Sequence, residues 1–326
     1  MRYFLGIDVA KDKLDCLWLR DTESFKVKTK VFPNQAKGFK ELKSWLEKNI
    51  TDELSDIHIT LEPTGVYHEP LAYALHAMGV NVSVVNPAFV RDFAKGLGSR
   101  SKTDKKDSMM LARYGAMTKP ALWQPEPTEI RELKALLSRL SALQADLQRE
   151  LNRLEKAQVS QASHAVIESI EVMVKGLRSE VARVEKQIND HIDQNPGLKR
   201  DRELLRSIPG VADVVSREMV SLLRSRHFRY AGQAAAFIGL VPRQWESGTM
   251  KGRTTLTKNG SSRIRAMLYM AAVVAKQYNP DIKQQYDRLI KAGKTKMQAL
   301  GAAMRKLVQI CYGVLKHQSE YRPQVA

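Results

Sequence analysis

The sequence predicts an α/β domain at the N-terminus, then a long helical arm, then a mainly helical and basic C-terminal domain. Short apolar runs alternate with amphipathic segments in residues 1–120, which is typical of a sheet covered by helices. Leucine and isoleucine recur every three or four residues in 121–199, and basic side chains dominate 200–326. With 326 residues, the chain is long enough for more than one hydrophobic core. We therefore expect three domains with these boundaries.

The N-terminal domain is predicted to contain four short strands with helices between and after them. The strands are expected at residues 3–9, 14–19, 56–61 and 81–85. The first two are close enough in the chain to form a hairpin. Amphipathic spacing predicts helices at 38–46, 68–78 and 107–116.

The arm begins after a proline-rich linker at residues 119–127. Two apolar stripes follow, separated by a polar break at 158–164, and the near-neutral charge of the arm argues against a nucleic-acid-binding role. We expect either an antiparallel hairpin or a coiled coil between chains; two amphipathic helices packed on their own domain are the alternative. The first stripe consists of Leu133, Leu136, Leu140, Leu143 and Leu147, and the second runs from Ile167 to Ile188.

The C-terminal domain is predicted to be helical around one polar loop. Residues 208–211 (IPGV) lie between two helical stretches and resemble a helix-hairpin-helix, whose glycine turn presents backbone N–H groups to a phosphate. A polar loop is expected at 243–260, followed by helices at 261–277 and 296–317.

Charge is distributed unevenly along the chain, whose formal net charge is +18. Residues 1–120 carry 19 basic and 15 acidic side chains, 121–199 carry 11 and 12, and 200–326 carry 23 and 8. A folded basic region favours nucleic acid as partner, with a merely solubilising surface, or a ribosome-like or chaperone-like binder, as the alternatives. Two distant cysteines exclude a disulfide framework, and no apolar run is long enough to span a membrane. We expect a cytoplasmic protein, associated with the nucleoid when bound to DNA.

Four carboxylates of the N-terminal domain follow predicted strands or begin a helix. Asp8 lies near the end of the first strand, Glu62 follows the strand at 56–61, and Asp104 and Asp107 are three residues apart at a helix start. Carboxylates that converge require a divalent cation, and hard oxygen ligands suit Mg²⁺ or Mn²⁺. Taken singly, each residue also fits a turn, a strand end or a helix N-terminus.

A series of short motifs runs along both ends of the chain. They are residues 6–11 (GIDVAK), 14–15 (LD), 62–67 (EPTGVY), 86–87 (NP), 102–104 (KTD) with Asp107, 208–211 (IPGV), 239–242 (GLVP), 247–248 (SG), 258–260 (KNG) and 263–269 (RIRAMLY). In this order they closely resemble the DEDD transposases of the insertion-sequence 110 family. Ser108 and Ser261 depart from the pattern, because alanine and asparagine are more usual there.

The resemblance implies an RNase H-like (RuvC-like) N-terminal domain, similar to Holliday-junction resolvases, in which Asp8, Glu62, Asp104 and Asp107 bind Mg²⁺. It also implies a serine nucleophile in the C-terminal domain, at the position of Ser247. Members of this family recombine donor and target DNA under the guidance of a bridge RNA. They act as dimers that assemble into a tetramer, with active sites composed from two protomers.

The residues around Ser247 agree with what the resemblance implies, since no histidine is near in sequence to act as its base. Six cations of the same region are expected to hold DNA phosphates: Arg243, Lys251, Arg253, Lys258, Arg263 and Arg265. We therefore expect a transposase that forms a 5′-phosphoserine link with DNA. The alternatives are a hydrolytic junction resolvase or RNase H-type nuclease, and a non-catalytic nucleic-acid-binding scaffold.

Overall fold

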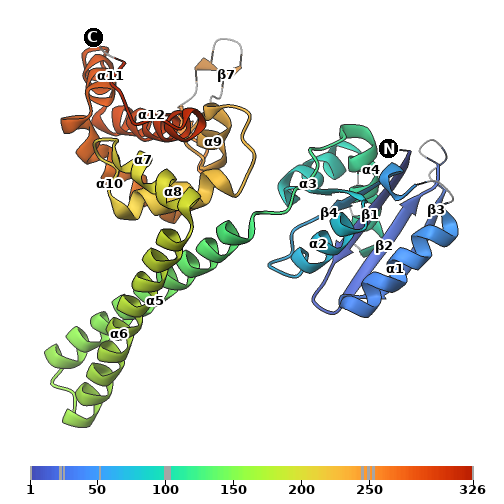
Figure 1. Ribbon diagram of the computed structural model, residues 1–326, viewed down its shortest axis with the longest axis horizontal. Coiled ribbons are helices and arrows are strands. Elements are labelled where there is room, and N and C mark those ends of the chain that lie inside the picture. The colour runs from blue at the N-terminus through green and yellow to red at the C-terminus, as the bar shows by residue number, and fades with distance from the viewer. Residues whose placement is uncertain are drawn as a thin grey trace. The chain divides into compact units, whose positions relative to one another are not determined.

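The computed structural model describes residues 2–21, 24, 26–50, 53–98, 104–243, 246–247, 250–251 and 254–324. At positions 104, 105, 246, 247, 250 and 251, only the backbone is described. The chain divides into two compact units, Met1–Pro125 and Glu126–Ala326, each with its own hydrophobic core (Figure 1).

The first unit is built on a five-stranded mixed sheet with the strand order β3-β2-β1-β4-β5. β1 pairs antiparallel with β2, as predicted, and β2 pairs antiparallel with β3, whereas β1, β4 and β5 are parallel. The mixed α/β class expected for this part of the chain is confirmed. The strands are β1 (Tyr3–Val9), β2 (Lys13–Leu19), β3 (Val27–Pro33), β4 (Ile57–Leu61) and β5 (Asn81–Val84).

Helices cover both faces of this sheet. Apolar side chains of α1 and α2 join the core formed by Leu5, Ile7 and Val9 on one face. On the opposite face, α4 packs against Leu17 and Leu19 through Ala112. The helices of this unit are α1 (Ala36–Asn49), the 3-10 turn η1 (Leu54–Asp56), α2 (Glu69–Ala77), α3 (Pro87–Gly96) and α4 (Asp104–Thr118).

The sequence prediction omitted two elements of this unit, β3 and α3. β3 is an edge strand whose central residues, Lys28, Thr29, Lys30 and Val31, are exposed, so it lacks the alternation that marks a half-buried strand. α3 buries one residue, Val90, and is started by Asn86, whose side chain accepts a hydrogen bond from the backbone N–H of Ala88 at 2.9 Å. Elements with few buried side chains leave little hydrophobic pattern to recognise.

His58 is a buried polar residue in the centre of this sheet. Its Nε2 lies 2.8 Å from the hydroxyl of Ser83, which itself donates to the carbonyl of Ala121 at 3.0 Å. Nε2–H of a neutral imidazole therefore donates to Ser83, while Nδ1 has no hydrogen-bond partner among the described residues. Burial lowers the pKa of His58 to about 4, because a proton on Nδ1 would place a charge in an apolar interior.

The unfolding free energy of the first unit is expected to fall as the pH drops below about 6.5. Below this pH, His58 is protonated in the unfolded chain but stays neutral in the folded chain down to about pH 4. This difference lowers the free energy of unfolding by about 2 kcal/mol at pH 5. Urea unfolding of a Trp245→Phe variant, whose remaining tryptophans all lie in the first unit, measures this. His58→Gln keeps a donor for Ser83 and should remove that part of the pH dependence. An unchanged slope between pH 7 and pH 5 would contradict the assignment.

The second unit is helical apart from the segment between α9 and α10. Helices α5 and α6 form an antiparallel hairpin, the arm predicted from the leucine and isoleucine stripes (Figure 1). The base of the hairpin, around Leu133 and Ile188, shares one core with the helices that follow. These elements are α5 (Thr128–Val159), α6 (His164–Gln194), α7 (Pro196–Arg206), α8 (Asp213–Arg224), α9 (Ala231–Phe237), α10 (Ser262–Tyr278), α11 (Pro280–Lys291) and α12 (Lys296–His317).

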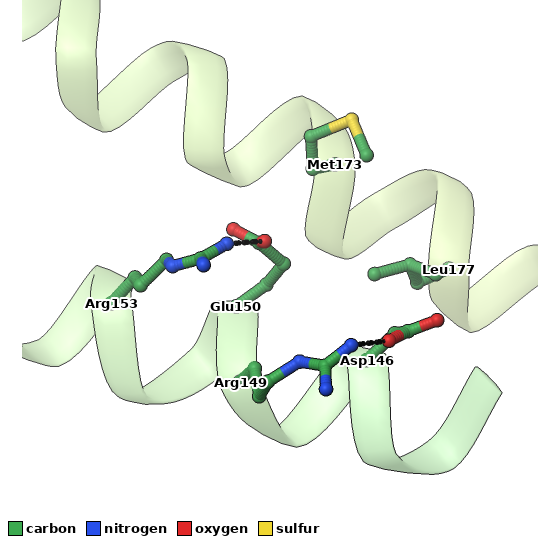
Figure 2. A pocket seen from close by; sticks show the side chains of 6 residues that line it. All are labelled: Asp146, Arg149, Glu150, Arg153, Met173 and Leu177. Carbon is green, nitrogen blue, oxygen red and sulfur yellow. Dashed lines mark hydrogen bonds and ion pairs between the residues drawn. The ribbon is translucent and has the colours of Figure 1, made fainter. Parts of the chain in front are cut away.

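The outer half of the arm carries no net charge that would attract DNA. A pocket between α5 and α6 is lined by two arginines, two carboxylates and two apolar residues, and each arginine pairs with a carboxylate of its own helix (Figure 2). Pairs one turn apart neutralise one another locally. The lining residues are Asp146, Arg149, Glu150, Arg153, Met173 and Leu177. No helix in the described part of the chain combines the length and apolar character needed to cross a membrane.

Candidate active site

Asp8 lies near the end of β1, on the face of the sheet that α4 covers. Successive side chains of a strand point to opposite faces, and Leu5, Ile7 and Val9 all belong to the core on the other face. Gly6 faces α4, since a Cβ atom built there would lie 2.0 Å from the carbonyl oxygen of Ser108. Asp8, two residues further on, therefore points to the α4 side.

Glu62 follows β4 at the same end of the sheet. β1 and β4 are parallel neighbours in which Ile7 pairs with Leu61. Asp8 and Glu62 directly follow the two residues of this pair. Leu61 belongs to the opposite core and Thr60 faces α4, so the alternation continued by one residue puts Glu62 on the α4 side. One carboxylate near the end of β1 and one directly after β4 thus lie at the same end of two neighbouring strands.

The start of α4 is fixed beside these strand ends. Ser108, which is buried, donates from its hydroxyl to the backbone carbonyl of Asp15 at 2.7 Å, and Asp15 is the register partner of Asp8. Asp107 precedes Ser108 and is half-buried. Asp107 therefore directly precedes the residue that anchors α4 beside β1 and β2. α4 begins at Asp104, whose side chain lies outside the described residues.

Replacing Gly6 by alanine is expected to destabilise the first unit by about 3 kcal/mol or more, because the new methyl group has no room beside the α4 backbone. Urea unfolding followed by tryptophan fluorescence in the Trp245→Phe background measures the loss. Gly96→Ala, at the end of α3 in the same unit, is the matched control. A Cβ there has no neighbour within 4 Å, so this change should leave the stability of the unit unchanged or raise it by up to about 1 kcal/mol. Equal effects of the two substitutions would show that α4 does not require close contact at Gly6.

Asp15 is a fifth carboxylate of this sheet edge, and it was not among the predicted site residues. It pairs in register with Asp8 across the β1–β2 hairpin and belongs to the alternation of Leu17 and Leu19, on the α4 side. Its carboxylate is 17% exposed and lies 3.0 Å from the ammonium group of Lys13. The sequence could have indicated Asp15, because Asp8 and Asp15 are equally far from the hairpin turn, and residues at equal distances from a turn pair across a hairpin.

The donor set of this edge suits a hard divalent cation, because it consists of carboxylate oxygens on the face and end of one sheet. Within the described side chains, no group of three or more His, Cys, Asp or Glu residues is close enough to hold a metal ion. The side chain of Asp104 is not among those described. Asp8 and Glu62 therefore lie at the same end of the sheet, and Asp107 lies in the first turn of α4, but the three side chains do not form a closed coordination shell among themselves.

Ser247 lies in a ribbon of short antiparallel strands, where the sequence predicted only a polar loop. Its backbone pairs with Met250 in β7 (Glu246–Ser247) and β8 (Met250–Lys251). A second antiparallel pair encloses this one in the chain: β6 (Pro242–Arg243) comes before β7, and β9 (Thr255–Leu256) comes after β8. The two pairs are nested, so Ser247 belongs to the inner hairpin. Its side chain lies outside the described part of the structure.

The end of this ribbon is held against α9 by close backbone packing. Gly239 has φ of +81°, and a Cβ there would meet the backbone N of Asn259 at 2.6 Å. A Cβ on Gly260 would lie 2.4 Å from the carbonyl oxygen of Phe237. The backbone N–H of Lys258 donates to the carbonyl of Gly239 at 3.1 Å. The backbones of the GLVP and KNG motifs therefore pack so closely that Gly239 and Gly260 leave no room for a Cβ atom.

The six predicted phosphate-binding cations differ in their surroundings. Arg263 forms a bidentate ion pair with the buried carboxylate of Glu218, and this hydrogen bonding raises the pKa of Arg263. Arg265 donates to the carbonyls of Gly260 and Ile238 at 2.6 and 3.1 Å. Both arginines thus make contacts within the fold. Arg243 and Lys258 are exposed, the side chain of Lys251 is not described, and Arg253 lies outside the described residues.

The helix-hairpin-helix-like segment joins α7 to α8. Gly210 has φ of +99°, and a Cβ there would lie 2.7 Å from the Cβ of Ala275 in α10. Close packing on α10 therefore requires this glycine, whether or not the turn contacts a phosphate.

Comparisons with known proteins agree over nearly the whole chain. Residues 5–160 match the profile of a family described as transposase, and residues 202–287 match one described as the IS116/IS110/IS902 transposase family. The pilin gene-inverting protein of Moraxella bovis is 30% identical over 99% of this chain and 98% of its own length. The transposase for insertion sequence element IS1111A of Coxiella burnetii is 23% identical over 75% of this chain and 74% of its own. This chain is therefore an enzyme of DNA strand transfer and belongs to the IS110 family of transposases.

Proposed function

We propose that this transposase cuts and rejoins DNA through a serine nucleophile assisted by a carboxylate-bound divalent cation. The observation that carries the proposal is that Asp8 and Glu62 lie at the same end of two neighbouring strands, and that the first turns of α4, which include Asp107, pack beside β1 and β2. The DEDD transposase family implies a divalent metal, and we assign Mg²⁺, or Mn²⁺, to these residues together with Asp104.

The sheet of the first unit supports an RNase H-like arrangement. Its order β3-β2-β1-β4-β5 puts the carboxylate-bearing β1 in the centre, between an antiparallel and a parallel neighbour. A central strand is buried on both sides, so Asp8 at its end has a fixed position. Positions fixed in this way favour metal-ion chemistry over a loosely held surface site.

In the proposed reaction, the Ser247 hydroxyl attacks a DNA phosphorus. The Oγ–P bond forms, the P–O3′ bond breaks, the hydroxyl proton leaves Ser247, and the departing oxygen takes up a proton to become a free 3′-OH. The cation, when bound, supplies polarisation of the attacking hydroxyl and neutralises charge on the departing oxygen. The 3′-OH of the exchanged strand then attacks the phosphoserine and releases Ser247, so the bond energy is conserved without ATP.

Residues near Ser247 in the chain support contact with a DNA backbone. Arg243 is exposed next to the inner hairpin, and Lys258 is exposed at the end of the ribbon. We assign these two, with Lys251 and Arg253, to the phosphates that flank the scissile bond. Arg263 and Arg265 we assign to holding the surrounding fold, because the contacts described for them lie within this unit.

Guidance by a bridge RNA and assembly into dimers and tetramers complete the proposed function. The excess of 23 basic over 8 acidic side chains in residues 200–326 supports binding of more than one nucleic-acid strand. Exposed apolar residues on the outer half of the arm, Val159, Val172 and Met173, support association between arms. Sequencing the nucleic acid that copurifies with the protein tests the RNA component.

The chemical proposal is tested by trapping the protein on a nicked DNA substrate in the presence of Mg²⁺. A serine nucleophile leaves a DNA strand covalently attached to the protein through its 5′ phosphate, whereas hydrolysis by activated water leaves free ends and no adduct. Denaturing gel electrophoresis separates these outcomes, and peptide mapping locates the attached residue.

A further inference from the structure

The connection between α8 and α9 is basic, aromatic and free of acidic residues. No Asp or Glu occurs between Glu218 and Glu246, whereas the segment 224–230 reads RSRHFRY. Arg226 and Arg229 are exposed there, and neither is among the residues expected above to hold the DNA backbone. The local potential is therefore positive over a surface that the proposed function leaves unassigned.

Aromatic rings lie among these cations, and two of them are exposed to solvent. Tyr230 is 61% exposed and Phe237 is 42% exposed, at the beginning and the end of α9. The Arg226 guanidinium lies over the Phe237 ring at 4.5 Å from its centroid. The seven-residue helix α9 that connects Tyr230 to Phe237 has a length of about 10 Å. We call Arg226, Arg229, Tyr230 and Phe237 the basic-aromatic patch.

Contacts with the rest of the unit hold the patch in shape. Phe228 packs at 5.9 Å from the Phe237 ring centroid, and its carbonyl accepts a hydrogen bond from Tyr312 at 3.0 Å. The Tyr230 ring lies against Gly232, where a Cβ would come within 2.9 Å of the ring. Rings fixed in this way lose little conformational freedom when a ligand stacks on them.

The patch borders the segment that ends the serine ribbon. The carbonyl oxygen of Phe237 lies where a Cβ on Gly260 would come within 2.4 Å, and the next carbonyl, that of Ile238, accepts a hydrogen bond from Arg265. The backbone of Phe237 therefore lies at the base of the ribbon that carries Ser247.

We propose that the basic-aromatic patch binds a nucleic-acid strand with unpaired bases, which stack on Tyr230 and on the Arg226–Phe237 pair. Aromatic rings and guanidinium planes stack on the faces of bases, and a duplex hides those faces. Arg229 and Arg226 supply positive charge for the adjoining phosphates. The inference deepens the proposed function by naming the form of nucleic acid that this side of the basic unit holds during strand exchange.

Fluorescence anisotropy with the full-length protein tests the patch. The probes are a short labelled single-stranded DNA, the RNA of the same sequence and the corresponding DNA duplex, all in EDTA so that no strand is cut. Tyr230→Leu is expected to weaken single-strand binding about tenfold, because stacking on one base is lost, and to change duplex binding less than roughly twofold. Arg226→Lys keeps the charge but loses the planar contact, so it should also weaken single-strand binding selectively.

Two substitutions serve as controls. Tyr230→Phe keeps the ring and should bind as the unaltered protein does. Tyr278→Leu removes a tyrosine of α10 that is 69% exposed and lies outside the patch, so it should also leave single-strand affinity unchanged. A selective loss shared by DNA and RNA supports the patch as a general single-strand site, and a loss confined to one of them supports it and identifies the bound strand. Unchanged single-strand affinity, or an equal loss on duplex, overturns it. Because the assay contains no metal and needs no reaction at Ser247, its failure is distinguishable from failure of the strand-transfer mechanism.

Discussion

Ser247→Ala is expected to abolish the covalent attachment of protein to a nicked DNA substrate, with no adduct detectable above background. Alanine has no oxygen to form the phosphoester, and no neighbouring group can replace it without changing the attached residue. The variant should still bind the same DNA, because the exposed cations of this unit remain. Denaturing gels of labelled DNA measure the adduct, and anisotropy measures binding.

The matched control for this substitution is Ser262→Ala, which removes an exposed serine in the first turn of α10. It should form the adduct at the rate of the unaltered protein. Covalent attachment that persists in Ser247→Ala would identify another nucleophile. Free 5′ phosphates without any adduct, in the unaltered protein, would favour the hydrolytic nuclease instead.

Asp8→Asn is expected to slow strand cleavage by on the order of a thousandfold, which corresponds to about 4 kcal/mol of transition-state free energy. The amide keeps the size of the side chain but removes the charge that a hard cation requires. Single-turnover cleavage over a range of Mg²⁺ concentrations measures the loss.

A second readout separates metal binding from activity. Mn²⁺ should raise the unfolding temperature of the unaltered protein and leave that of Asp8→Asn unchanged. Asp12→Asn makes the same change at an exposed position four residues away and should retain both activity and the metal response. A metal response that survives in Asp8→Asn would remove this residue from the site.

The sequence was sufficient where a pattern is local. Short apolar runs predicted β1, β2, β4 and β5 within a residue or two, and the stripes through Leu133 and Ile188 predicted the two helices of the arm. These elements bury a regular set of side chains, so the spacing of apolar residues in the sequence is enough to predict them. β3 has exposed polar residues along its centre, and only its pairing with β2 makes it a strand.

Tertiary contacts assigned roles that spacing alone left open. Arg263 and Arg265 look like phosphate ligands in a basic sequence, but their described partners are Glu218 and the carbonyls of Ile238 and Gly260. The sequence around Gly210 resembles a phosphate-binding turn. In the structure, this glycine allows close packing against Ala275 of α10. Tyr230 and Phe237 carry no recognisable motif, and they form a patch only because α9 and the α8–α9 connection bring Arg226 over Phe237.

The chain by itself determined which carboxylates, glycines and serine carry the motifs of an IS110 transposase, since those are residue identities at fixed spacing. Only the tertiary structure decided that Asp8 and Glu62 follow paired positions of parallel strands, on the face where α4 packs against Gly6. Strand register and helix position depend on contacts between residues far apart in the chain: Ser108 bonds to Asp15 across 93 positions. No local pattern encodes such contacts, because their free energy comes from burial and hydrogen bonding in the assembled unit.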